Sequence, residues 1–235
     1  MNEQQWRPVV GSNDILRARY RADFGEPHAL LVKLAEDDYL VYSPGRGQLD
    51  SARQLIADEA RVILLAPSMG HSLGLREWSE GFSHSRVVST SGARNHLAQK
   101  TALPVFHDSR EINSLLPDHI RIVDVPDNSF GECWLRIETP ERIYWAVCDS
   151  LMNLPSLGNN FLMRGLLKCY GLGVGLHLHK RFRRGVKDKS GFLQWALQQF
   201  DSDKAQVLIP CHGDIDDASD LAQQLRRLLE RNFPA

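Results

Sequence analysis

The chain lacks the features that define several large classes of protein. Its four cysteines include no CxxC pair, which argues against a structural zinc ribbon. No apolar run approaches the roughly 20 residues that span a bilayer, and the first residues, MNEQQWRPVV, lack the apolar segment of a signal peptide. A formal net charge of −1 gives no global reason to expect nucleic-acid binding. We therefore expect a cytoplasmic protein without a transmembrane segment.

The cysteines that are present predict buried free thiols in a reducing compartment. Cys133, Cys148 and Cys211 lie in or beside apolar runs, where a free cysteine behaves as a small apolar residue. Cys211 is the exception to follow, because it precedes His212 and thiolates are good ligands for zinc and iron.

The pattern of apolar residues predicts an α/β (α+β) protein with mixed sheets covered by helices. With 235 residues the chain is long enough for one large domain, and we assign residues 1–235 to it. Strands come first, then strands alternate with helices, then more strands and finally helices follow. The predicted strands are residues 29–34, 39–42, 61–65, 86–89, 120–125, 132–138, 143–148 and the run from 207; the predicted helices are 49–59, 73–81, 92–100, 190–200 and 218–231. Residues 151–190 are predicted as a helical and basic insertion.

Three of the predicted strands are followed by a residue that can ligate a metal. The run VLIPCHGD ends in Pro and Gly around His212, so this imidazole is expected at a strand end. The strand at 61–65 leads through AlaProSerMetGly to His71, and the strand at 143–148 leads directly into Asp149. Strand ends from one sheet edge can bring such side chains together, so His71, Asp149 and His212 form the candidate site.

These stretches, taken in order, resemble the metallo-β-lactamase superfamily, and most of all a divergent branch known as the domain-of-unknown-function 4336 group. The resemblance rests on TyrLeuValTyrSerProGly at 39–45, ValIleLeuLeuAlaProSerMetGlyHis at 62–71, ArgGluTrp at 76–78, TyrTrpAlaValCysAsp at 144–149 and LeuIleProCysHisGly at 208–213. It implies a four-layer αββα sandwich of two mixed β-sheets, with metal bound at one edge between the sheets.

The resemblance also implies a reduced metal site. Pro67, Met69 and Asn128 stand where a typical member has the three histidines of its first metal. At the second metal, Ser72 replaces a histidine. The remaining second-metal positions are filled, His71 standing for the motif's aspartate, Asp149 for the bridging aspartate and His212 for the last histidine. Two imidazoles and a carboxylate suit one zinc, iron or manganese ion.

Three functions follow as hypotheses. The first is a metal-dependent hydrolase in which Asp149 and His212 are catalytic and the metal activates a water against a carbonyl or phosphoryl centre of a small-molecule substrate. The second is a non-catalytic member of the fold with a decayed centre and no metal, which binds a ligand or partner through residues 151–190. The third is a mononuclear iron protein with redox or oxygen-linked chemistry.

Other charged and polar residues allow two interpretations each. Asp214 either orients His212 or caps the C-terminal helix. His177 and His179 would share one side of a strand, but no motif supports them as ligands. The basic run at 180–189 is either a solvated face or a lid that binds an anionic substrate, and apolar residues near it also allow contact with a membrane surface.

Overall fold

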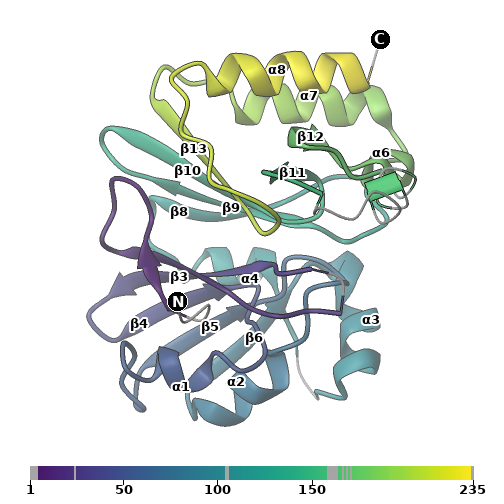
Figure 1. Ribbon diagram of the computed structural model, residues 1–235. Coiled ribbons are helices and arrows are strands. Elements are labelled where there is room, and N and C mark those ends of the chain that lie inside the picture. Colours follow the sequence, from purple (N-terminus) through teal and green to yellow (C-terminus); the bar gives the residue numbers. More distant parts are fainter. Residues whose placement is uncertain are drawn as a thin grey trace.

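The protein forms two mixed β-sheets that pack face to face (Figure 1). The structure is a computed structural model, and it describes residues 5–23, 25–103, 106–157, 164, 165, 167, 169 and 171–233. The first sheet has the strand order β1-β2-β3-β4-β5-β6-β7. Its strands are β1 (Arg7–Pro8), β2 (Ile15–Arg19), β3 (His28–Ala35), β4 (Asp38–Tyr42), β5 (Arg61–Leu65), β6 (Ser85–Ser89) and β7 (His107–Asp108). Pairing is antiparallel from β1 to β4 and parallel from β4 to β7.

The second sheet has the order β13-β10-β9-β8. It consists of β8 (Ile120–Asp124), β9 (Cys133–Glu138), β10 (Arg142–Val147) and β13 (Ala205–Pro210). Strands β10 and β13 run parallel, whereas β8, β9 and β10 pair antiparallel. A separate antiparallel pair joins β11 (Leu151–Leu154) to β12 (Gly175–Leu178).

Helices cover the outer face of each sheet, which completes the expected four-layer αββα sandwich (Figure 1). On the first sheet lie α1 (Leu49–Ala52), α2 (Leu75–Gly81) and α3 (Ser91–Thr101); on the second lie α6 (Lys180–Gly185), α7 (Lys189–Gln199) and α8 (Leu221–Asn232). The short helix α4 (Ser109–Asn113) contacts β6, β7 and β8 and so touches strands of both sheets. None of the helices in the described residues is long and apolar enough to cross a membrane.

Three apolar clusters hold these layers together. One lies between the sheets and includes Leu40, Leu135 and Ile209. The second packs the first sheet against its helices around Trp78, and the third packs the other sheet against α7 and α8 around Trp145. The amphipathic pattern at 218–231 is confirmed in α8, whose buried side chains are Leu221, Leu225, Leu228 and Leu229.

Several elements differ from the sequence prediction. The pairing of β1 and β2 was not predicted, because β1 has two exposed residues and β2 carries arginines among its apolar residues. The helix predicted at 49–59 ends as an α-helix at Ala52. The described part of the predicted helical insertion contains the β11–β12 pair as well as α6, so a helical description of residues 151–190 is incomplete.

Candidate metal centre

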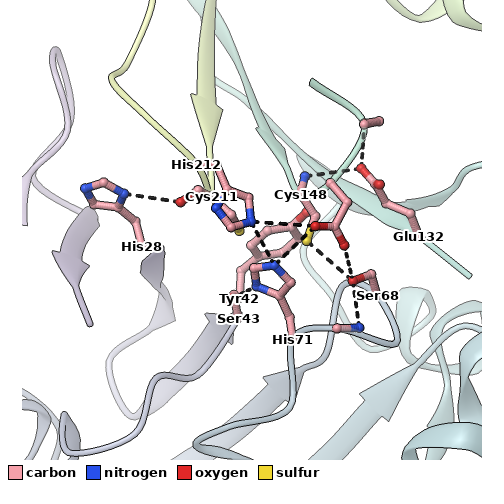
Figure 2. A network of polar contacts seen from close by, with 12 residues as sticks. His28, Tyr42, Ser43, Ser68, His71, Glu132, Cys148, Cys211 and His212 are labelled. Carbon is pink, nitrogen blue, oxygen red and sulfur yellow. Dashed lines mark hydrogen bonds and ion pairs between the residues drawn. The ribbon is translucent and has the colours of Figure 1, made fainter. Parts of the chain in front are cut away.

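The carboxyl ends of four strands meet at one edge of the sandwich. Strands β4 and β5 are parallel neighbours in the first sheet, and β10 and β13 are parallel neighbours in the second. Ser43 follows β4 directly, Asp149 is the second residue after the end of β10, and the loop after β5 leads to His71. His212 follows β13, so residues far apart in the sequence converge where the four strands end (Figure 2).

The structure brings the three predicted ligands into mutual contact. Nε2 of His71 lies 3.2 Å from Nε2 of His212. Oδ1 of Asp149 lies 3.6 Å from each of these two nitrogens. A tetrahedral ion with bonds of about 2.1 Å holds its ligand atoms about 3.4 Å apart, so the three separations match one face of such a tetrahedron.

The three candidate ligands are only partly accessible to solvent. The side chains of His71, Asp149 and His212 are 7%, 16% and 21% exposed. His71 is therefore the inner member and His212 the outer one. Met69, which the resemblance aligns with a histidine of the first metal, packs against the outer helical cluster of the first sheet.

Hydroxyl groups orient two of the three side chains. Nδ1 of His71 lies 2.7 Å from Oγ of Ser43, which is itself 2.8 Å from the buried hydroxyl of Tyr20. Ser43 adopts a left-handed φ of 59°, an uncommon conformation for a residue with a Cβ atom. Ser68 donates a hydrogen bond of 2.6 Å to Oδ2 of Asp149, which leaves Oδ1 facing the two imidazoles. Such partners fix the orientation of ligand side chains.

The loop that carries His212 is fixed by backbone contacts on both sides. The guanidinium of Arg17 donates to the carbonyl oxygens of Pro210 and Gly213, and the backbone N–H of His28 donates to the carbonyl of Cys211 at 2.8 Å. The backbone N–H of Asn153 donates to the carbonyl of His212 at 3.1 Å. Partial burial lowers the pKa of Arg17 to about 10, which leaves it charged at neutral pH. The first sheet thus holds the His212 loop of the second.

The electrostatics of the site favour a positive charge between the carboxylate and the imidazoles. Burial alone would lower the pKa of His71, but Tyr20, Cys211 and Asp149 raise it well above its usual value. Burial alone would raise the pKa of Asp149, yet His71 and His212 hold it well below its usual range. The carboxylate is therefore ionised, and either a proton or a metal ion can supply the compensating charge.

A second buried carboxyl group, Glu132, lies beside the site without joining it. Its Oε1 accepts hydrogen bonds from Ser150 Oγ at 2.6 Å, Trp134 Nε1 at 3.1 Å and Cys148 N at 3.2 Å. Its Oε2 has no partner among the described residues. Burial, and then the charge of Asp149, raise the pKa of Glu132 to about 8. The carboxyl group is therefore mostly protonated near neutral pH.

Glu132 should make the fold less stable as pH rises. An acid whose pKa is raised on folding contributes stability that is complete below its unfolded value, here 4.5, and is lost as pH rises through about 8. A single proton gives a slope of at most about 1.4 kcal/mol per pH unit. We expect Glu132→Gln to flatten the decline of unfolding free energy between these values, measured by denaturant titration. The exposed Glu59→Gln is the control, and equal slopes for wild type and Glu132→Gln would contradict the prediction.

The other residues singled out from the sequence have structural partners. Asn128 accepts hydrogen bonds from Phe130 N and Glu132 N and donates to Val125 O, so its amide shapes the turn before β9. His177 contacts the backbone of its own turn at Gly173 and Gly175. Helix α8 begins at Leu221 with Asp220 as its N-cap, so the prediction that Asp214 caps it was wrong.

Sequence reasoning missed the residues that orient the candidate ligands. Ser43, Ser68 and Tyr20 carry no ligand-type signature, and Arg17 lies in a strand that the pattern did not predict. The available signal was position alone, because Ser43 directly follows the strand at 39–42 and Ser68 lies inside the loop that leads to His71.

Comparisons with known proteins place the fold. No protein-family model matches the chain, and no curated protein matches it in sequence. A metallo-β-lactamase from Hirschia baltica superposes with a TM-score of 0.58 at 10% identity, over 96% of this chain and 98% of that one. A β-lactamase domain protein from Burkholderia ambifaria gives 0.59 at 13% identity, over 96% of this chain and 75% of that one.

Flavodiiron proteins share the same fold. A point mutant of the flavo di-iron protein from Thermotoga maritima gives a TM-score of 0.57 at 13% identity, over 92% of this chain. This chain spans 57% of the length of that protein. At these identities the likeness shows the fold alone, which is the metallo-β-lactamase fold.

Proposed function

We propose that this protein is a metal-dependent hydrolase with one metal ion held by His71, Asp149 and His212. The observation that carries the proposal is the set of ligand-atom separations, 3.2, 3.6 and 3.6 Å, which a single tetrahedral ion can satisfy. The fold supports it, because metal-binding proteins are among those that share it, including the di-iron protein from Thermotoga maritima. The likeness to the domain-of-unknown-function 4336 group is part of the same proposal.

The residues of the chain would divide the work as follows. A bound divalent ion supplies Lewis acidity, which makes a water nucleophilic towards a carbonyl or phosphoryl centre. Asp149 provides the negative charge and His71 the buried imidazole, each oriented by a serine hydroxyl group. His212, the most exposed of the three, borders the side from which a small-molecule substrate can enter. Zinc, iron and manganese all fit two imidazoles and one carboxylate.

The basic segment at 180–189 keeps its proposed role as a lid for an anionic substrate. It contains α6, which is anchored by the buried Phe182 and by a hydrogen bond from Arg183 to Asn232. The helix also follows His179, whose backbone N–H donates to the carbonyl of Ser150 next to Asp149. This connection links the segment to the strand end that carries the candidate ligand.

A non-catalytic protein with a decayed centre is the second candidate. The observation in its favour is that the positions of the usual first metal offer no ligand, since the Asn128 amide is used by backbone groups and Met69 packs into an apolar cluster. In that case the contacts among His71, Asp149 and His212 would be structural only.

Metal content separates these two candidates. We expect about one zinc, iron or manganese ion per wild-type chain by elemental analysis. With manganese, which prefers oxygen and nitrogen donors over sulfur, we expect the ion to be lost in His212→Ala. In the metal-free protein this change should alter thermal stability little, because the side chain is partly exposed and adds little core burial. The exposed His84→Ala controls for removal of an imidazole. Substoichiometric metal in the wild type after supplementation with each ion, together with a changed melting temperature in His212→Ala, would favour the decayed centre.

A further inference from the structure

Two buried cysteines lie directly behind the proposed ligands. Cys148 precedes Asp149 and Cys211 precedes His212, and the two side chains are 0% and 2% exposed. Strands β10 and β13 pair in parallel up to Val147 and Pro210, and Cys211 N then donates to Val147 O at 2.8 Å. The pairing therefore extends by one bond to Cys211, and both cysteines lie in the apolar core between the sheets.

These thiols form a second set of donors with His71. One ligand atom from His71 and the Sγ atoms of Cys148 and Cys211 all lie within 4.8 Å of one another. A zinc–sulfur bond is about 2.3 Å, so two thiolates on one tetrahedral ion are about 3.8 Å apart. A shift of about 1 Å or less would bring the three donors to bonding separation. Figure 2 shows Cys148 and Cys211 in the same group of side chains as His71.

A hydrogen-bonded serine connects the two donor sets. Cys148 Sγ lies 3.7 Å from Ser68 Oγ, and the same hydroxyl donates to Asp149 Oδ2. The sulfur set is the more deeply buried one, because His71 is the innermost member of the outer set and both thiols are shielded from solvent. The third cysteine of the core, Cys133, is equally buried on β9 and belongs to neither donor set.

We propose that Cys148 and Cys211 form, together with His71, a metal position of two thiolates and one imidazole beneath the His71–Asp149–His212 position. Sulfur ligands favour thiophilic ions such as zinc, cadmium and cobalt over magnesium and manganese. The centre then offers harder ions the outer oxygen and nitrogen donors and softer ions the inner sulfur donors. The proposal rests on the proposed function only through the shared ligand His71, since neither Asp149 nor His212 contributes to the inner position.

Cobalt titration of the full chain tests the inner position. A thiolate bound to Co²⁺ gives a ligand-to-metal charge-transfer absorption in the near ultraviolet, which imidazole and carboxylate ligands do not give. We expect this band in the wild type, its loss in Cys148→Ala and in Cys211→Ala, and its retention in Cys133→Ala, which controls for the loss of a buried thiol. Replacing a residue that only contacts a metal ligand costs about 10–100-fold in metal affinity. Cadmium affinity should therefore fall at least that much in Cys148→Ala and Cys211→Ala, which remove a ligand itself.

His212→Ala separates this inference from the proposed function. We expect it to keep the charge-transfer band while it loses the outer position. Cobalt binding without a charge-transfer band in the wild type, abolished in His212→Ala, would overturn the inner position and leave the proposed function standing. Absence of any metal binding by the wild type would overturn both. Cadmium-113 NMR of the wild type reports sulfur ligation without a variant, so a chemical shift typical of oxygen and nitrogen ligands alone would also overturn the inner position.

Discussion

Replacing Asp149 with asparagine is expected to abolish binding at the outer position while the protein stays folded at neutral pH. The change keeps the size of the side chain and an oxygen that can accept the hydrogen bond from Ser68. It removes the charge that faces His71 and His212 at 3.6 Å. Replacing a residue that only orients a metal ligand costs about 10–100-fold in metal affinity. Asp149 is itself a proposed ligand, so we expect its replacement to lower metal affinity by more than about a hundredfold, measured by competition with a chromogenic chelator.

The same variant should change the acid dependence of stability in the metal-free protein. His71 and His212 lower the pKa of Asp149, so its ionised form contributes stability that is present above its ordinary value of 3.8 and is lost as pH falls. The difference in unfolding free energy between wild type and Asp149→Asn should therefore be largest near neutral pH and shrink in acid.

Asp214→Asn is the matched control for the loss of a carboxylate close to His212, because its side chain is exposed. We expect it to retain metal and the wild-type acid profile. A fall in metal affinity in Asp214→Asn would instead support the interpretation that Asp214 orients His212. Metal affinity unchanged in Asp149→Asn would exclude this carboxylate as a ligand.

The sequence predicted where the three candidate ligands lie because each follows a strongly apolar strand. The runs at 61–65 and 143–148 are largely buried, so their ends are well defined by pattern. Parallel pairing aligns the end of β5 with that of β4 and the end of β10 with that of β13, and the packing of the two sheets brings these ends to one edge. The layers were predicted for a different reason, namely the resemblance to a known fold, since order and periodicity alone indicated only mixed sheets with helices.

The residues that hold and orient the candidate ligands could not be predicted in the same way. Strand β2 is irregular in composition, and its place in the sheet depends on pairing with β3, which is a tertiary contact. Arg17 reaches the His212 loop across 193 residues of sequence, and no local pattern encodes that distance. Ser43 has an unusual left-handed backbone conformation, and its hydroxyl lies within hydrogen-bond distance of His71. Neither feature has a signal in the sequence. The side chains that orient a site are thus set by the assembled fold.

Gly213→Ala is expected to damage both the fold and the outer metal position. Gly213 has a φ of 103°, a region that disfavours residues with a Cβ atom. A Cβ atom there would clash with the carbonyl oxygen of Asn153. Strained backbone alone costs about 1–3 kcal/mol, so with the clash we expect a larger loss of unfolding free energy by denaturant titration.

Gly25→Ala separates the two causes of that loss. Gly25 has a similar φ of 92°, but a Cβ atom there meets nothing within 4 Å. It should therefore show the cost of the backbone conformation without the cost of a clash, and metal binding should be unchanged. In Gly213→Ala the backbone at residue 213 must move away from Asn153. This movement displaces His212, because His212 precedes Gly213 and its carbonyl accepts a hydrogen bond from the backbone N–H of Asn153. Equal destabilisation by the two substitutions, with metal retained in both, would show that the His212 loop tolerates movement and that the close approach at Gly213 does not position the ligand.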